Sequence, residues 1–329
     1  EAKSHLEGML REAEKTQAVQ RKKAPLTAVE ELELKTLLAG ECLLPSDHEG
    51  TACSEENEAC VLAQHVRASL TMTRYDFAIL LDAEGDMTRD TGWLNDNIVN
   101  FYMTLLRDGG LAGTRRRFCF IQFWAGNKVH TTRGTNRQKA INTTFARMHN
   151  AAMRAPGAAK FPPPCVQRTD AVAFTINNGV HWNTAVIDVG KKMVGRYDSS
   201  GWDGGDSHSV LVRTTEIALE ALAAEQQEAF DPQADLHQLA SYKPKKHILF
   251  TGEQGNGNDC GVFSLATLDW LTDDLDPYPP PPATKGDEAF VHQKDMPNLR
   301  RRFALEMLKG QLLRTTLNPP RHPAPESSA

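Results

Sequence analysis

The most informative stretch of this chain is Gln254-Gly-Asn-Gly-Asn-Asp-Cys-Gly261. The stretch 246–250 that comes before it ends in Ile-Leu-Phe and predicts a short strand, and the mostly apolar stretch 262–271 that follows predicts a helix. The glycines between the two stretches allow a tight turn and a close approach of another backbone. We therefore expect a strand-to-helix loop that lets a substrate come close to the main chain.

Cys260 is the residue of this loop with reactive chemistry. Asn258 or Asp259 can cap the helix, which puts Cys260 in its first turn. There the unpaired backbone N–H groups and the helix dipole favour the thiolate, which is the reactive form of cysteine. On this loop alone, a small apolar side chain buried at a helix start explains Cys260 equally well.

A nucleophilic cysteine needs a base and a group that orients the base. His181 opens one predicted strand, and Asp198 closes the next. If 190–191 is a two-residue turn, paired positions sum to 381, so that Asp198 faces Asn183 and His181 lies diagonally opposite on the same face. Such neighbours are about 7–8 Å apart at Cα, within reach of a His–Asp hydrogen bond. Taken singly, a core or surface histidine and a strand-end aspartate remain the alternatives.

Further candidates would bind the substrate. Gln254 precedes Cys260 by six residues, and its side-chain amide can donate to a developing oxyanion together with the Cys260 N–H. Trp182 adjoins the candidate base, and Trp93 follows Gly92 just before a predicted helix. Two indoles over a reactive cysteine would form a flat slot that admits only a narrow peptide such as Gly-Gly. A loop glutamine in solvent and tryptophans in the core are the alternatives.

Composition excludes several classes of protein. The 329 residues are 40% hydrophobic and carry a formal charge of −5, which suits a folded chain and not a general nucleic-acid coat. No apolar run approaches the roughly 18 residues of a membrane span. The six cysteines are sparse and irregularly spaced, so we expect neither a disulfide framework nor a zinc site, and a reducing compartment is the default.

The chain divides into three predicted parts. Residues 1–69 form a helical and linker extension whose helices lie outside the main core, 70–316 form one folded domain, and 317–329 form a disordered tail. Within the domain, helices are expected at 73–81, from about 96 to 109, and at 134–155, 210–229, 262–271 and 296–313, and strands at 118–124, 171–176, 181–189, 193–197 and 246–250. A proline-rich interruption stands at 277–282.

The stretch 109–169 has no Asp or Glu but many Lys and Arg residues. It predicts either a basic face for an acidic partner or RNA, or a solvated surface whose partners lie elsewhere in the chain.

Several blocks of the sequence resemble, in order, the Ulp1/SENP family of SUMO-specific cysteine proteases, the C48-type ubiquitin-like-protein proteases. The blocks are Trp93-Leu-Asn-Asp-Asn-Ile-Val-Asn-Phe-Tyr-Met103, Gly179-Val-His-Trp182, Tyr197-Asp-Ser-Ser-Gly201, 254–263, and 295–300 with 306–308. The resemblance covers about 72–313. It implies a papain-like α+β fold with a central mixed β-sheet packed between helices.

The resemblance also implies a role for each candidate residue. Cys260 would be the nucleophile, His181 the general base, Asp198 its orienting partner and Gln254 the oxyanion donor. The substrate-binding residues would be Trp93 and Trp182, which flank the Gly-Gly tail, and Asp96, which pairs with a basic residue on the body of SUMO.

The activity implied is hydrolysis of the isopeptide bond between the Gly-Gly end of SUMO and a substrate lysine, with trimming of SUMO precursors. It needs no metal or organic cofactor. The implied partners are SUMO and SUMO-conjugated proteins, with no membrane and no nucleic acid, and the implied location is the nucleus, the cytoplasm or both. The alternatives are a deneddylase, a protease for another Gly-Gly-ended modifier, a catalytically silent SUMO-binding module, and RNA binding by the basic stretch.

Overall fold

The structure is a computed structural model, and it describes a large part of the chain. The described residues are 5–6, 9, 17–18, 20–41, 43, 59–82, 92–110, 118–121, 171–177, 179–188, 193–200, 243–244, 249–250, 254–273 and 291–313. The elements predicted outside these ranges are the helices at 134–155 and 210–229, the interruption at 277–282, the tail at 317–329 and most of the basic stretch.

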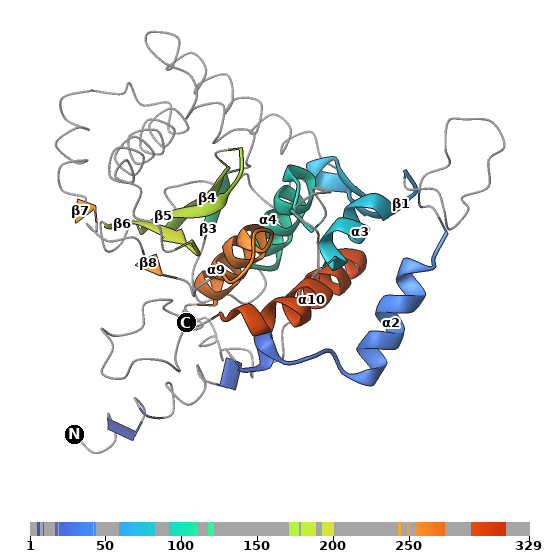
Figure 1. Cartoon of the computed structure of the whole chain (residues 1–329), viewed down its shortest axis with the longest axis horizontal. Helices are drawn as coiled ribbons and strands as arrows, with labels where there is room; N and C mark the ends of the chain where they lie inside the picture. The colour runs from blue at the N-terminus through green and yellow to red at the C-terminus, as the bar shows by residue number, and fades with distance from the viewer. Residues whose placement is uncertain are drawn as a thin grey trace, which may run out of the picture.

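A six-stranded mixed sheet forms the centre of the fold (Figure 1). Its strands are β3 (Phe118–Ile121), β4 (Ala171–Asn177), β5 (Trp182–Asp188), β6 (Met193–Asp198), β7 (Lys243–Pro244) and β8 (Leu249–Phe250). The pairs β4–β5 and β5–β6 are antiparallel, whereas β3 runs parallel to β4, and β7 and β8 both run parallel to β6. The mixed sheet predicted from the sequence is therefore confirmed.

The register between β5 and β6 is the one predicted for a two-residue turn. Thr184 pairs with Tyr197, and Asp188 pairs with Met193, so paired positions sum to 381 (184 + 197 and 188 + 193). One step beyond the first pair, Asp198 comes to the same end of the hairpin as the start of β5. The turn itself lies outside the described residues.

Capping side chains start the first two helices of the domain. Helix α3 (Arg74–Leu81) follows Thr73, whose Oγ1 accepts from the backbone N–H of Asp76 while the Asp76 carboxylate accepts from the Thr73 N–H. Helix α4 (Asp96–Gly110) follows Asn95, whose Oδ1 accepts from the Ile98 N–H at 2.9 Å. Thr and Asn are favoured before a helix because such a bond satisfies a backbone N–H group that the first turn leaves free.

Two further helices complete the core of the domain. Helix α9 (Cys260–Thr272) is mostly apolar and buried along its whole length, as expected for a central helix. The 3-10 turn η4 (Gln293–Asp295) leads into α10 (Met296–Lys309), which has Pro297 in its first turn and ends at Gly310 in the left-handed conformation. The predicted helices at 262–271 and 296–313 are confirmed, the second ending a little earlier.

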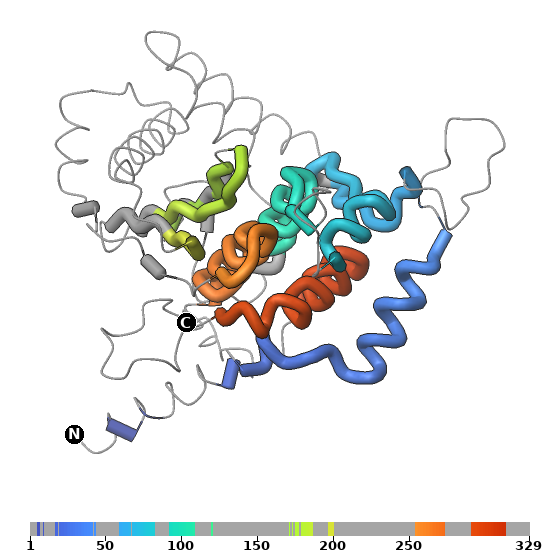
Figure 2. The backbone as a smooth tube through the Cα atoms, in the orientation of Figure 1, coloured from blue at the N-terminus to red at the C-terminus, as the bar shows by residue number. Residues whose placement is uncertain are grey.

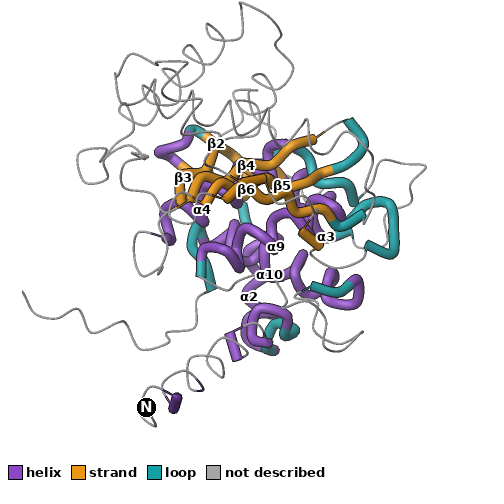
Figure 3. Tube along the Cα trace, turned by 90° about the vertical axis from the view of Figure 1, so that its left-hand side faces the viewer, coloured by secondary structure: helices purple, strands orange, loops and turns teal. Residues whose placement is uncertain are grey.

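The helices stack in layers below the sheet (Figure 3). Helix α9 packs against β5 and β6, and α4 packs against β3 and α9. Helix α10 contacts α9, and the N-terminal helix α2 (Ala28–Leu38) contacts α10. The nucleophile candidate thus begins the helix that lies directly on the strands carrying the candidate base.

The N-terminal segment differs from the prediction, because α2 does not lie outside the main core. Leu34 is 1% exposed and belongs to the core cluster. Figure 2 shows the blue segment that contains α2 running beside the red α10. Glu31 binds Arg301, and Glu33 binds Lys309 at 2.9 Å. These ion pairs hold α2 against α10.

A small hairpin occupies part of the predicted linker. Strand β1 (Val61–His65), the 3-10 turn η1 (Val66–Ala68) and β2 (Leu70–Thr73) form it, and Leu62 of β1 is in the core cluster. The linker prediction was wrong here because the polar composition around it hid a short half-buried strand. Cys60, at the start of this hairpin, is disulfide-bonded, which the cysteine spacing did not predict.

Candidate active site

Cys260 is the first residue of α9, as predicted. Its thiol is free, and the residue is 2% exposed. Asp259 is the N-cap residue, so the sulfur lies at the end of the helix where unpaired N–H groups and the positive end of the dipole favour an anion.

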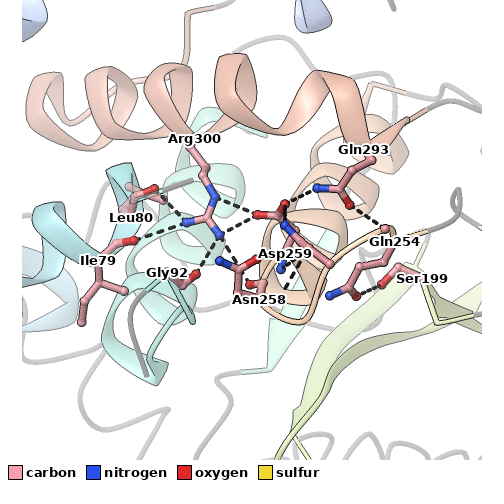
Figure 4. Close-up of polar contacts among 11 residues, drawn as sticks. Ile79, Leu80, Gly92, Ser199, Gln254, Asn258, Asp259, Gln293 and Arg300 are labelled. Atoms are coloured by element: carbon pink, nitrogen blue, oxygen red, sulfur yellow. Dashed lines mark hydrogen bonds and ion pairs between the residues drawn. The ribbon is translucent and has the colours of Figure 1, made fainter. Parts of the chain in front are cut away.

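The Asp259 side chain, however, does not cap the helix, so that part of the prediction was wrong. Its Oδ1 accepts from Nε and Nη2 of Arg300 at 2.8 and 2.6 Å. Its Oδ2 accepts from Asn256 at 2.7 Å and from Gln293 (Figure 4). Both Asp259 and Arg300 are almost fully buried, and a buried guanidinium without its carboxylate would be a costly uncompensated charge. The Asp259 carboxylate is therefore engaged by Arg300 and not by the helix N–H groups.

His181 and Asp198 form the predicted pair. The His181 Nε2 lies 2.7 Å from Asp198 Oδ1, and the same oxygen accepts from the backbone N–H and the hydroxyl of Ser200 at 2.9 and 2.8 Å. The carboxylate is 1% exposed and the imidazole 18%. These contacts fix both the position of the carboxylate and the plane of the ring.

Charge and hydrogen bonding separate the pKa values of the two groups widely. Burial acts to lower the pKa of His181, but hydrogen bonds and charge interactions with Asp198 and Cys260 outweigh it and raise this pKa to about 9. Burial acts to raise the pKa of Asp198, but the bonds from His181 and Ser200 lower it to about 2. Because Asp198 occupies Nε2, the nitrogen left to face the Cys260 thiol is Nδ1.

Gln254 lies beside the end of β6. Its backbone N–H donates to the Ser199 carbonyl at 3.0 Å, and its side-chain oxygen accepts from the Ser199 hydroxyl at 3.0 Å (Figure 4). Since the amide oxygen is used in this way, the NH2 group is the end of the side chain that can donate to a substrate.

The two tryptophan segments meet through Leu94. The Trp182 indole N–H donates to the Leu94 carbonyl at 2.8 Å, and Trp182 is buried, whereas its counterpart Trp93, next to Leu94, is half-buried. Gly92 has a φ of 79°, a conformation that favours glycine, and it sets the direction of the chain into Trp93. A slot between the indoles stays a prediction.

Asp96 stands apart from these contacts. It is the first residue of α4, and its side chain is exposed. Among the described residues, no hydrogen bond or ion pair joins Asp96 to Cys260, His181 or Asp198, and a role for Asp96 in binding a partner stays a prediction.

Several residues that hold this site were not among those predicted from the sequence. Arg300 and Gln293 bind Asp259 from the far end of the chain, and Asp76 accepts from Asn95 at 2.8 Å and from Asn97 at 3.0 Å. No local spacing signals such contacts, because the partners belong to different elements. Arg300 lies within the 295–300 block, and Ser199 and Ser200 lie within the Tyr197–Gly201 block, but the resemblance implied no role for any of them.

Two negative findings concern the part of the chain that the structure describes. It contains no group of His, Cys, Asp and Glu side chains able to hold a metal ion. It also contains no helix long and apolar enough to cross a membrane.

The fold and the site define a class, the α+β proteins of papain-like fold, with a thiol at a helix start and an imidazole–carboxylate pair on neighbouring strands. Residues 92–312 match the Ulp1 protease family, C-terminal catalytic domain. The match spans more than half of the chain, which therefore belongs to the Ulp1 protease family.

Individual relatives are distant. Sentrin-specific protease 2 of Mus musculus is 27% identical over 227 residues, which are 67% of this chain and 31% of the relative. A sentrin-specific protease of Caenorhabditis elegans is 25% identical over 225 residues, 68% of this chain and 26% of the relative. The chain thus spans less than a third of the length of these two relatives.

The solved C-terminal Ulp1 protease domain, in complex with Smt3, the yeast ortholog of SUMO, has a TM-score of 0.54 and 18% identity to this chain. The similarity covers 87% of this chain and 96% of the solved one. It confirms the fold class predicted from the sequence.

Proposed function

We propose that this protein is a SUMO-specific cysteine protease that hydrolyses the isopeptide bond between the Gly-Gly end of SUMO and a substrate lysine and trims SUMO precursors. The observation that carries the proposal is the contact of His181 with Asp198 at 2.7 Å, together with the interaction of His181 with the Cys260 thiol, in a chain of the Ulp1 family. The names of its relatives, and the Smt3 bound to the solved Ulp1 domain, support SUMO as the partner.

The reaction begins with the transfer of the Cys260 proton to Nδ1 of His181, while Asp198 holds Nε2 and fixes the orientation of the ring. The thiolate attacks the carbonyl carbon of the terminal glycine of SUMO. Its oxygen becomes an oxyanion, to which the Gln254 amide and the Cys260 backbone N–H donate.

The bond between carbon and the lysine nitrogen then breaks, and His181 returns its proton to the departing amine. This leaves SUMO joined to Cys260 as a thioester. His181 next takes a proton from a water molecule, which attacks the thioester. The carbon–sulfur bond breaks, and His181 returns its proton to the sulfur of Cys260. The acid formed at the end of SUMO releases the second proton of the water to solvent, so that SUMO leaves as a carboxylate.

The substrate is selected by access and by charge. Cys260 is 2% exposed, which suits a thin chain without side chains, and Trp93 and Trp182 flank such a Gly-Gly tail. Asp96, exposed at the start of α4, pairs with a basic residue on the body of SUMO. The partners are SUMO and SUMO-conjugated proteins, and the reaction needs no cofactor.

We infer a nuclear or cytoplasmic location, or both, from the likeness to the SUMO proteases. Residues 70–316 form the protease domain of this proposal. The basic run Arg21-Lys22-Lys23 is too short to count as a nuclear signal, and Lys22 is 6% exposed and paired with Asp269. Fractionation of cells that express the full chain tests the location.

The test of the function uses SUMO and NEDD8 precursors, and each modifier with an electrophile at its C-terminus. Cleavage of the SUMO precursor and a covalent SUMO adduct on Cys260, located by mass spectrometry and absent from Cys260→Ser, support the proposal. Cleavage of the NEDD8 precursor alone overturns it in favour of a deneddylase. SUMO binding with an unmodified Cys260 overturns it in favour of a binding module.

A further inference from the structure

The buried guanidinium of Arg300 joins several segments of the candidate active site (Figure 4). Besides Asp259, its Nη2 donates to the carbonyl of Gly92 at 2.7 Å, and its Nη1 donates to the carbonyl of Leu80 at 3.0 Å. Arg300 is 0% exposed. One side chain therefore contacts the residue before Cys260, the residue before Trp93 and the end of α3.

Gln293 extends this network to the candidate oxyanion donor. Its Nε2 donates to Oδ2 of Asp259, while its Oε1 accepts from the backbone N–H of Gly255 at 2.8 Å (Figure 4). Gly255 follows Gln254 directly, and Asp259 precedes Cys260 directly. Both ends of the loop are therefore bridged by a single side chain from outside it.

Stability alone is a weak explanation for this arrangement. A buried ion pair is costly to desolvate, and apolar side chains of similar volume are often as stable or more stable. The geometry of the loop is a better explanation. Oxyanion donors act only when they lie at hydrogen-bond distance from the developing charge, and a displacement of about 1 Å can cost about a hundredfold in rate.

We propose that Arg300 and Gln293 are positioning residues, which hold Gln254, Cys260 and the Trp93 segment in the spacing that the reaction needs. This inference rests on the proposed function, because the spacing matters only if Cys260 attacks a carbonyl group. Neither residue touches the substrate. Arg300 acts through Asp259 and Gly92, and Gln293 acts through Asp259 and Gly255.

The test uses Gln293→Met in the full chain, because methionine keeps the length of the side chain and removes both hydrogen bonds. Gln293 is half-buried, so this variant is expected to fold. Lys294→Ala, an exposed neighbour in the same 3-10 turn, is the matched control. Arg300→Lys, which keeps the charge and loses the planar fork, is the second variant, and thermal unfolding of all variants is recorded beside the kinetics.

For Gln293→Met we expect kcat on the SUMO precursor to fall by about tenfold or more with KM nearly unchanged. Amide hydrogen exchange in 254–259 should become faster, and Lys294→Ala should match the wild type. An unchanged kcat overturns the inference, and so does a rise in KM alone, because either result removes the positioning role.

Failure of the proposed function gives a different result. A wild-type protein that neither cleaves a SUMO precursor nor reacts with the SUMO electrophile overturns the function. In that case the amide hydrogen exchange of residues 254–259 still tests the network without any measurement of activity. Unchanged exchange of 254–259 in Gln293→Met overturns the positioning role.

Discussion

The imidazole of His181 and the carboxylate of Asp198 are in contact, with Nε2 2.7 Å from Oδ1, although 17 positions separate the two residues in the chain. The antiparallel pairing of β5 and β6 produces this contact, because it brings the start of one strand to the end of the other. The backbone N–H and the hydroxyl of Ser200 donate to the same carboxylate oxygen. The pair therefore owes its geometry to the register of these two strands.

The pH dependence of activity should reflect this pair. The alkaline limb of kcat/KM is expected near pH 9, because protonated His181 must deliver a proton to the leaving amine and its pKa is raised to about 9. In Asp198→Asn the largest raising contribution is lost, so the limb should move toward 6.5, the ordinary pKa of histidine, and only weak activity should remain. Rates of SUMO precursor cleavage between pH 5 and 10 measure this. A wild-type limb near 6.5 would contradict it.

Stability should depend on pH through the same two groups. The folded-state pKa of Asp198, about 2, is below 3.8, so its stabilisation is present above pH 3.8 and lost as the pH falls toward 2. The folded-state pKa of His181 is above 6.5, so its stabilisation is complete below 6.5 and lost as the pH rises through about 9. The difference in urea midpoint between wild type and Asp198→Asn should be largest from 3.8 to 6.5. A difference that grows at alkaline pH would refute the assignment.

Cys260→Ser should abolish turnover and preserve the complex with SUMO, because a hydroxyl at this position is a far weaker nucleophile but has nearly the same shape. His181→Ala should do nearly the same. Turnover is followed by gel assay of the SUMO precursor, and binding by calorimetry. Full activity in Cys260→Ser would remove Cys260 from the mechanism.

Local features of the fold could be predicted from the sequence, whereas long-range polar contacts could not. The pairing of β5 with β6 follows from the turn length and the strand pattern, and the position of Cys260 follows from the start of an apolar helix. The contact of Arg300 with Asp259 spans 41 positions and depends on how α10 crosses α9. The predicted side-chain cap by Asp259 is absent for the same cause, since capping propensity says nothing about a guanidinium that competes for the carboxylate.

The N-terminal segment makes a second long-range polar contact that the sequence did not predict, and this contact leads to a prediction about stability. Nζ of Lys22 lies 2.7 Å from carboxylates of both Asp269 and Asp273, and its side chain is 7% exposed. In Lys22→Met the buried Asp269 loses its nearest cation, with Arg302 remaining at 3.8 Å. We expect a loss of about 3 kcal/mol in the free energy of unfolding, measured in urea.

The matched control for Lys22→Met is Lys35→Met, an exposed lysine of α2, for which a change within about 0.5 kcal/mol is expected. Equal stability of the two variants would show that the segment before α2 is dispensable for the fold. It would then support an independent extension, as the sequence suggested.

Gly261 is the residue of helix α9 that packs against Leu94, the neighbour of Trp93 in the chain. A Cβ atom placed on Gly261 would lie 2.9 Å from Cβ of Leu94 and 3.0 Å from its Cγ, closer than carbon atoms normally approach. In Gly261→Ala, the gain in helix propensity, up to about 1 kcal/mol, opposes an overpacking cost of about 1–3 kcal/mol. Leu94 must shift, and its carbonyl carries the hydrogen bond from Trp182. We therefore expect both the unfolding free energy and kcat/KM to fall.

A double-mutant cycle with Leu94→Ala separates this contact from a general effect of alanine in the helix. Leu94→Ala alone should be destabilising, because it leaves a cavity at a residue that is 2% exposed. In the double variant the new methyl group occupies part of that space, so the two losses in unfolding free energy should sum to more than the loss measured for the pair. Strictly additive losses would mean that the methyl group at position 261 and the Leu94 side chain do not compete for the same space. The close approach of Leu94 would then not be the reason for glycine at position 261.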